Sequence, residues 1–151
     1  MRPVLIITCR AGSEDWCEEE IGNVLFPYDP EVRVVKTKYP GLLIVYSKLD
    51  PLRAYTISLS SEYGFVEKII PVQIYDKFNI DALNKILNIV GYGEKIKVKL
   101  RVRGRRGLSM IIWKRIIELL KRKNSRHDPS SNICLYVEVI DDSFYAGRAK
   151  C

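Results

Sequence analysis

Strict alternation of cationic and apolar residues marks one stretch of the chain, Lys95-Ile96-Lys97-Val98-Lys99-Leu100-Arg101-Val102-Arg103. Because successive side chains of a β-strand point to opposite faces, this pattern predicts a half-buried strand with a purely cationic outer face. The wider segment 95–126 has thirteen Lys or Arg and a single acid, Glu118, whereas the net charge of the whole chain is only +7. A positive field concentrated in one segment indicates a polyanionic partner.

A glycine-flanked arginine turn follows the strand, Gly104-Arg105-Arg106-Gly107, and an amphipathic helix follows the turn. Ser109 is the predicted N-cap of this helix, whose apolar residues recur at intervals of three and four. Glycines allow a tight backbone path, a helix N-terminus offers free N–H groups to an anion, and arginines bind phosphate oxygens. The candidate RNA-binding residues are Lys97, Lys99, Arg101, Arg103, Arg105, Arg106, Ser109, Lys114 and Arg115.

The composition is that of a globular protein, with 47% hydrophobic and 28% charged residues over 151 positions. No apolar run approaches the ~20 residues of a membrane-spanning helix, and no signal peptide is visible, so we expect a cytoplasmic protein without membrane association. The four cysteines have no CxxC spacing, and we expect all four to be reduced unless the source is a hyperthermophile. The chain has one histidine, so no metal site is expected.

The first 72 residues predict a ferredoxin-like βαββαβ unit. Strands are expected over 4–9, 32–38, 42–47 and 65–72. Ser13 and Asp50 are the expected caps of the two intervening helices. The apolar face expected for the first helix consists of Trp16, Cys17, Ile21, Val24 and Leu25.

Residues 73–151 predict a second unit with the order αβαββ, so the fold class of the whole chain is α+β. A helix is expected over 80–90 with Asn79 as its cap, and the basic strand, the arginine turn and the second helix come next. Strands over 133–139 and 144–149 are joined by the hairpin turn Asp141-Asp142-Ser143. The segment 71–79 is the expected boundary between the two units.

The second half resembles the THUMP domain, an RNA-binding module of tRNA-modifying enzymes. The resemblance rests on residues 98–109, on Asp128-Pro129, and on residues 135–140 with Tyr145-Ala146-Gly147. The first half resembles the ferredoxin-like subdomain that precedes THUMP, and it is most similar to the stand-alone THUMP proteins that assist tRNA cytidine acetylation. This second similarity rests on residues 6–10, 41–43 and 70–72. The resemblance implies that the chain binds tRNA through its acceptor end and 3′ terminus and presents it to a separate cytidine N4-acetyltransferase.

The sequence has no glycine-rich cofactor loop and no paired nucleophile and base, so we expect neither a cofactor nor catalytic activity. Three other functions stay open. Gly104-Arg105-Arg106-Gly107 fits the GxxG loop of a KH-like RNA-binding module. The acidic helix of the first half is compatible with a protein-interaction adaptor whose RNA contacts are incidental. An enzyme with an unfamiliar site is the third.

Overall fold

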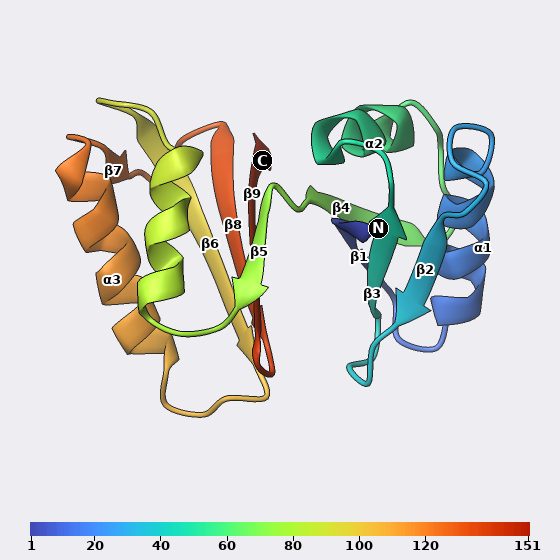
Figure 1. The fold of residues 1–151 in the computed structure, drawn as a ribbon, viewed down its shortest axis with the longest axis horizontal. Coiled ribbons are helices and arrows are strands. Elements are labelled where there is room, and N and C mark those ends of the chain that lie inside the picture. Colours follow the sequence, from blue (N-terminus) through green and yellow to red (C-terminus); the bar gives the residue numbers. More distant parts are fainter. The chain divides into compact units, whose positions relative to one another are not determined.

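The computed structural model describes all residues, Met1–Cys151, and the chain divides into two compact units, Met1–Val72 and Gln73–Cys151 (Figure 1). Each unit has its own β-sheet and its own cluster of buried apolar side chains. The fold class is therefore α+β, as predicted. None of the helices combines the length and the apolar character needed to cross a membrane.

The first unit has the ferredoxin-like topology. Its elements are β1 (Arg2–Cys9), α1 (Glu14–Leu25), β2 (Arg33–Lys36), β3 (Leu42–Ser47), α2 (Pro51–Leu59) and β4 (Val66–Pro71). The strands are all antiparallel in the order β2-β3-β1-β4. Side chains from α1 and α2 share one apolar cluster with the inward residues of β1 and β3, so both helices cover the same face.

The two predicted caps of this unit have different outcomes. Asp50 caps α2 as predicted, because its carboxylate accepts hydrogen bonds from the N–H groups of Leu52 and Arg53 at 3.0 and 3.4 Å. The prediction for Ser13 is wrong, since its side chain makes no capping bond to α1. Glu14 satisfies backbone donors instead, at Gly12 (2.6 Å) and at Gly41 (3.0 Å), and so ties the start of α1 to the β2–β3 turn.

Helix α1 buries Cys17, Ile21 and Leu25 but not Trp16, whose predicted core position is wrong. A residue directly before Cys17 points about 100° away from it around the helix. Trp16 is 56% exposed, and its ring stacks on Phe65 with a distance of 5.5 Å between the ring centroids.

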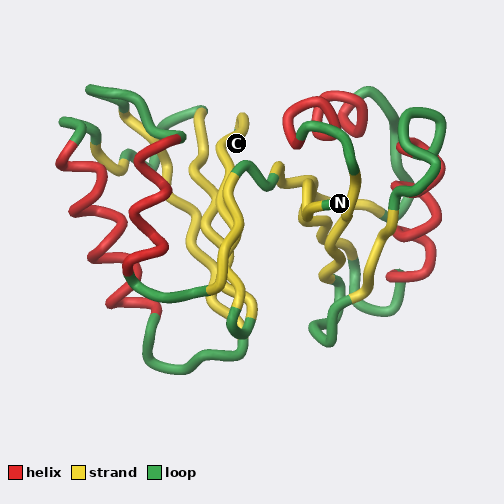
Figure 2. Tube along the Cα trace, in the orientation of Figure 1, coloured by secondary structure: helices red, strands yellow, loops and turns green.

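The second unit is a five-stranded sheet with both helices on one face (Figure 2). Its elements are β5 (Ile74–Lys77), the 3₁₀ helix η1 (Asp81–Asn88), β6 (Lys95–Arg103), α3 (Ser109–Arg122), β7 (Arg126–His127), β8 (Ile133–Ile140) and β9 (Ser143–Lys150). The strand order is β5-β9-β8-β6-β7. Strand β6 runs parallel to β8 and β7, whereas the pairs β8–β9 and β5–β9 are antiparallel.

Two differences from the predicted elements occur at the start of this unit. Strand β5 lies in the segment expected to be a connection. It exists because its backbone pairs with β9, which is distant in the sequence. The helix expected over 80–90 is a 3₁₀ helix, and its buried residues Leu83 and Ile86 fit a three-residue repeat. The hydrogen bond expected of Asn79 as a cap is present, because its side chain accepts the Ala82 N–H at 2.8 Å.

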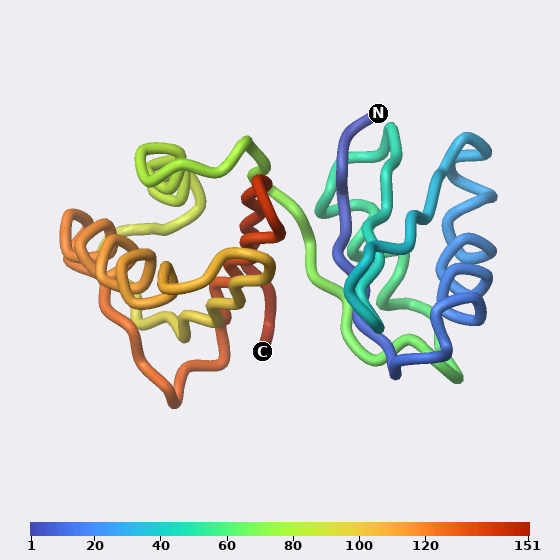
Figure 3. Tube along the Cα trace, turned by 90° about the horizontal axis from the view of Figure 1, so that it is seen from below, coloured from blue at the N-terminus to red at the C-terminus, as the bar shows by residue number.

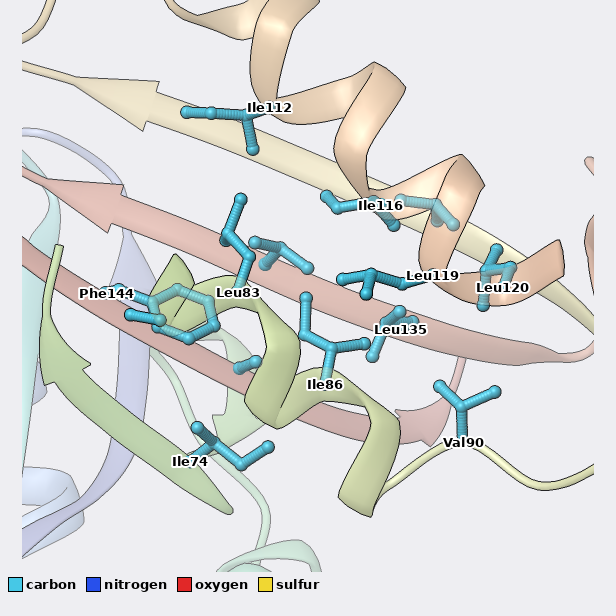
Figure 4. Close-up of a cluster of buried hydrophobic side chains, with 14 of the residues drawn as sticks. Ile74, Leu83, Ile86, Val90, Ile112, Ile116, Leu119, Leu120, Leu135 and Phe144 are labelled. Atoms are coloured by element: carbon cyan, nitrogen blue, oxygen red, sulfur yellow. The ribbon is translucent and has the colours of Figure 1, made fainter. Parts of the chain in front are cut away.

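The core of the second unit lies between the sheet and the two helices (Figure 4). Apolar residues of η1 and α3 meet side chains of β5, β6, β8 and β9 there, including Ile74, Leu83, Ile86, Ile112, Ile116, Leu119, Leu135 and Phe144. Figure 3 shows α3 and η1 side by side as two neighbouring coils. This layer fixes β6 with its apolar residues inward and therefore turns its cationic residues outward.

The expectation of four reduced cysteines is wrong for one pair, because Cys134 and Cys151 form a disulfide with their Cα atoms 5.1 Å apart. The β8–β9 register places Cys134 opposite Ala149, so Cys151 follows two residues after that partner. This proximity depends on strand pairing and not on any local cysteine spacing. Cys9 and Cys17 are free and buried, and burial raises the pKa of the Cys17 thiol to about 12.

Candidate nucleic-acid interface

Strand β6 has the predicted bounds and the predicted alternation. Ile96 and Val98 are buried against the helical layer, whereas Lys99 and Arg101 are exposed and Lys97 is half-buried. These three residues, Lys97, Lys99 and Arg101, are called the β6 cations below. None of them takes part in an ion pair or a side-chain hydrogen bond, so their charges are available to a ligand.

All outward residues of β6 are cationic, as predicted, but the neighbouring strand β8 places an acid on the same face of the sheet. Glu138 on β8 lies in register with Arg101 and accepts a 2.8 Å hydrogen bond from Arg103. The exposed fractions of the Arg103 and Glu138 side chains are 17% and 8%. Arg103 is therefore held in a largely buried ion pair. The alternation along β6 could not predict this pair, because the acid lies on the neighbouring strand β8.

The arginine turn has the glycine-dependent path that was predicted. Gly104 and Gly107 have φ angles of 80° and 74°, in the left-handed region that favours glycine. Arg105 donates to Asp142 at 2.8 Å, and its guanidinium lies 5.4 Å from the centroid of the Phe78 ring. Arg105 thus ties the turn to the β8–β9 hairpin, whereas Arg106 is exposed and has no ion pair.

Helix α3 begins without a side-chain cap, so the predicted N-cap role of Ser109 is wrong. Ser109 is the first helical residue, and the flanking Leu108 already has a helical backbone. The Ile112 N–H donates to the Leu108 carbonyl, which starts the helical hydrogen bonding one residue earlier than predicted. The first turn contains no acid, and Ser109 is exposed beside the arginine turn.

The last two candidates, Lys114 and Arg115, lie on α3 and have different surroundings. Lys114 is exposed and unpaired. Arg115 donates to Asn84 on η1 at 2.8 Å and lies 3.5 Å from Glu118, so it braces the two helices against each other.

The nine candidates therefore do not form one surface. The β6 cations point away from the helical layer, whereas Lys114 lies on a helix at the other side of the sheet. Arg103, Arg105 and Arg115 are engaged within the chain. The open candidates are Lys97, Lys99, Arg101, Arg106, Ser109 and Lys114.

The KH-like alternative does not fit the structure, because Gly104 and Gly107 flank a connection between β6 and α3 and not between two helices. His127 has structural contacts: its Nδ1 accepts the Val98 N–H at 3.0 Å, and its ring meets Trp113 edge-on at 4.9 Å. No group of three or more His, Cys, Asp and Glu side chains is arranged to hold a metal ion.

One exposed aromatic residue of this unit was not identified from the sequence. Tyr92 lies between Gly91 and Gly93 and is 79% exposed. A tyrosine between two glycines next to a basic strand is the signal that could have drawn attention to it.

No protein-family model matches this sequence, and no curated protein matches it. Solved structures do match its fold. PH1313 from Pyrococcus horikoshii Ot3 has a TM-score of 0.74 at 18% identity, over 99% of this chain and 55% of that chain. TrmN from Thermus thermophilus has a TM-score of 0.70 at 17% identity, over 97% of this chain and 45% of that chain. A 4-thiouridine synthetase in complex with RNA and ATP has a TM-score of 0.57 at 17% identity, over 99% of this chain and 42% of that chain.

These structures overturn the expectation that the chain has no catalytic activity. Proteins with this fold include the synthetase and a predicted N6-adenine-specific DNA methylase from Listeria monocytogenes. The match to the methylase has a TM-score of 0.56 at 14% identity and covers 95% of this chain and 39% of that chain. The chain spans between 39% and 55% of the length of these structures. The missing cofactor loop therefore does not exclude an enzyme.

The matches to PH1313 and to the synthetase each cover 99% of this chain and therefore include both units. Identities below one fifth establish the fold alone. The fold is that of a ferredoxin-like unit followed by a THUMP unit.

Proposed function

We propose that this chain binds tRNA through its second unit, Gln73–Cys151. The observation that carries the proposal is the set of β6 cations, which lie on one strand face without acidic partners. Lys and Arg side chains that contact phosphates supply most of the affinity of RNA-binding proteins. The presence of RNA in the complex of the similar 4-thiouridine synthetase supports RNA as the polyanion.

The geometry of β6 suits a phosphate backbone. Alternate residues of a strand lie about 6.6 Å apart on one face, so three cations can follow a run of phosphates. Duplex RNA hides its deep groove from side chains, and such contacts therefore select by shape and by unpaired ends. Arg106 and the uncapped start of α3 lie at the C-terminal end of the same strand and extend the contact.

The finer part of the proposal concerns the RNA and its destination. The chain binds the acceptor end with the 3′ terminus and presents it in the cytoplasm to a cytidine N4-acetyltransferase carried by a separate protein. The support for this part is the resemblance of the second half to the THUMP domain and of the first half to the stand-alone THUMP proteins.

The test is binding of intact tRNA and of tRNA without its 3′-terminal nucleotides, each measured across a salt series. Tighter, salt-dependent binding of the intact tRNA is expected. Equal binding of both tRNAs would contradict recognition of the 3′ terminus. Equal binding of tRNA and an unrelated polyanion such as heparin would contradict the proposed function as a whole.

A second candidate function is a protein-interaction adaptor, which one observation in the first unit favours. The exposed, stacked rings of Trp16 and Phe65 line a hollow of about 220 Å³ together with Glu19, Glu20 and Asn23. Glu20 fixes this arrangement, because its carboxylate accepts the backbone N–H groups of Gly64, Phe65 and Val66 at 2.5, 2.8 and 3.0 Å.

Acidic surroundings favour a basic partner protein at this hollow over RNA. Co-purification with and without nuclease separates the two functions. A partner that survives nuclease treatment and is lost in Trp16→Ala would favour the adaptor. A partner that nuclease removes would favour RNA binding.

A further inference from the structure

The most exposed large hydrophobic residue of the second unit is Tyr92, at 79%. It lies in the loop that leads from η1 to β6, with a glycine on either side. An aromatic ring that is exposed to water does not stabilise its own chain by burial, and it is available to a ligand. The groups around the ring then decide which ligand it can bind.

The backbone beside Tyr92 is fixed by partly buried polar groups. The Glu94 carboxylate accepts the Gly91 N–H and two hydrogen bonds from Arg148 on β9, at 2.9 and 2.6 Å. Buried Ser125 donates to the Gly91 carbonyl at 2.7 Å and accepts the Glu94 N–H at 3.0 Å. A Cβ atom at position 91 would lie 2.7 Å from the Glu94 carboxylate, so a larger residue there would require the Glu94 side chain to shift.

The other end of the loop is attached to the end of α3. The Gly93 N–H donates to the Lys123 carbonyl at 2.8 Å. The Lys123 ammonium group lies 5.1 Å from the Tyr92 ring centroid and donates to the Val90 carbonyl at 2.6 Å. The backbone of the loop is therefore held on both sides of Tyr92, and the Lys123 ammonium group is the contact made by the ring itself.

The surroundings of the ring are cationic. Lys95 on β6 and Arg126 on β7 are paired in the sheet directly after the loop, and both are exposed without an ion pair. Two acids lie nearby. Glu94 is paired with Arg148, and that guanidinium lowers the pKa of Glu94. Asp128 accepts hydrogen bonds from Ser130, and these bonds, together with the charges of Arg126 and Lys95, lower the pKa of Asp128. An aromatic ring surrounded by cations is the combination that binds single-stranded nucleic acids, where bases stack and phosphates pair.

The loop also lies in line with the proposed RNA contacts. It is at the N-terminal end of β6, beside β7, and the arginine turn is at the opposite end of the same strand (Figure 1). A strand of this length spans about 30 Å, so the β6 cations lie between Tyr92 and Arg106.

We propose that Tyr92 is a base-stacking residue for single-stranded RNA. An unpaired nucleobase stacks on the phenol ring while Lys95 and Arg126 bind the flanking phosphates. The inference rests on the proposed function and deepens it, because it adds a contact to bases to the phosphate contacts of β6. The unpaired 3′-terminal nucleotides of tRNA are one source of such a base.

The experiment uses fluorescence anisotropy with a labelled single-stranded RNA of about eight nucleotides and with the same oligomer carrying abasic positions. The full chain is compared with Tyr92→Ala, with Tyr92→Phe and with Tyr28→Ala, a control at a 53% exposed tyrosine of the first unit. Tyr92→Ala is expected to weaken binding of the base-containing RNA about tenfold. Tyr92→Phe keeps the ring and is expected to bind normally, as is Tyr28→Ala.

Two further measurements, the salt dependence of binding and the binding of abasic RNA, distinguish base stacking from phosphate binding at Tyr92. The loss in Tyr92→Ala is expected to leave the salt slope unchanged, because no phosphate contact is removed. Abasic RNA is expected to bind the unsubstituted chain and Tyr92→Ala equally. An equal loss on abasic RNA, or an equally Tyr92-dependent binding of polyglutamate, would overturn the inference.

Variants of the β6 cations separate this inference from the proposed function. Weakened RNA binding in Lys99→Ala and Arg101→Ala, with unchanged binding in Tyr92→Ala, would overturn the role of Tyr92 alone. Unchanged binding in all three variants would overturn the proposed function as well.

Discussion

Arg103 on β6 donates a 2.8 Å hydrogen bond to Glu138 on β8, and both side chains are largely buried. The two strands run parallel, and the bond crosses from one strand to the other near the C-terminal end of β6. Arg103, the last cation in the alternating strand, is therefore part of the sheet's own structure, and the candidates that remain open on this face are the β6 cations.

Arg103→Ala is expected to lower the free energy of unfolding by about 3 kcal/mol, because it removes the ion pair that Arg103 forms with the buried Glu138 carboxylate. Urea unfolding followed by circular dichroism measures the loss. The double variant Arg103→Met with Glu138→Leu should be closer to the unsubstituted chain than Arg103→Ala is, since it leaves no buried charge. A double variant as unstable as the single one would contradict this explanation.

Lys99→Ala and Arg101→Ala are each expected to reduce the slope of log affinity for tRNA against log salt by about 0.7 to 0.9, because each removes one phosphate contact. Neither change breaks an ion pair, so stability should stay unchanged within about 0.5 kcal/mol. Arg53→Ala removes an exposed, unpaired arginine of the first unit and is the matched control. A slope that falls equally in this control would mean that only net charge matters.

Stability at low pH depends on Glu94. Hydrogen bonds from Arg148 lower its pKa below the ordinary value of 4.5, so its ionised form stabilises the native state above that pH. This contribution is lost as the pH falls through the lowered pKa, where the carboxylate takes up a proton. Glu94→Gln is expected to be less stable at pH 7, by about 2 kcal/mol, and to approach the unsubstituted chain as the pH falls through the lowered pKa of Glu94. Thermal unfolding across this range tests the prediction, and a constant difference between the two would contradict it.

Reduction of the Cys134–Cys151 disulfide is expected to lower the free energy of unfolding by about 3 kcal/mol, because the bond closes a loop with a sequence separation of 17 residues. Cys151→Ser should reproduce the loss and should not respond to reductant. Thermal unfolding with and without dithiothreitol makes the comparison. An unchanged midpoint on reduction, with both thiols shown free by mass spectrometry after alkylation, would contradict the prediction.

Gly41→Ala is expected to destabilise the chain far more than Gly107→Ala. Both glycines have a φ of 74°, so both substitutions cost about 1 to 2 kcal/mol of backbone strain. An added Cβ at Gly41 would also lie 2.2 Å from the carbonyl oxygen of Cys9, whereas Gly107 has open space around it. Chemical denaturation of both variants measures the difference, and similar losses would show that the contact at Gly41 relaxes.

Elements with a strong local pattern were predictable from the sequence. The bounds of β3 and β6 follow from continuous or alternating apolar residues, and the Asp50-Pro51 pair located the start of α2. The order of these elements was enough for the ferredoxin-like unit and for the α+β class. These features depend on the spacing of apolar residues and on the residues that begin a helix, and both can be read from residues that are close together in the sequence.

Features that depend on pairing between distant residues were not predictable. Strand β5 requires β9, the disulfide requires the β8–β9 register, and the buried pair of Arg103 requires an acid 35 residues away. The candidate site is affected in the same way, because alternation located the β6 cations but could not show which arginines have partners. The RNA contacts of the open residues stay predictions.

The tryptophans are distributed one to each unit. In the first unit, Trp16 is exposed and its ring stacks on Phe65. In the second unit, the Trp113 ring contacts His127. Unfolding of the first unit changes the surroundings of one indole, and unfolding of the second changes those of the other. Fluorescence of Trp16→Phe and Trp113→Phe therefore reports on each unit separately, and coincident or separate transitions show whether the two units unfold as one cooperative system.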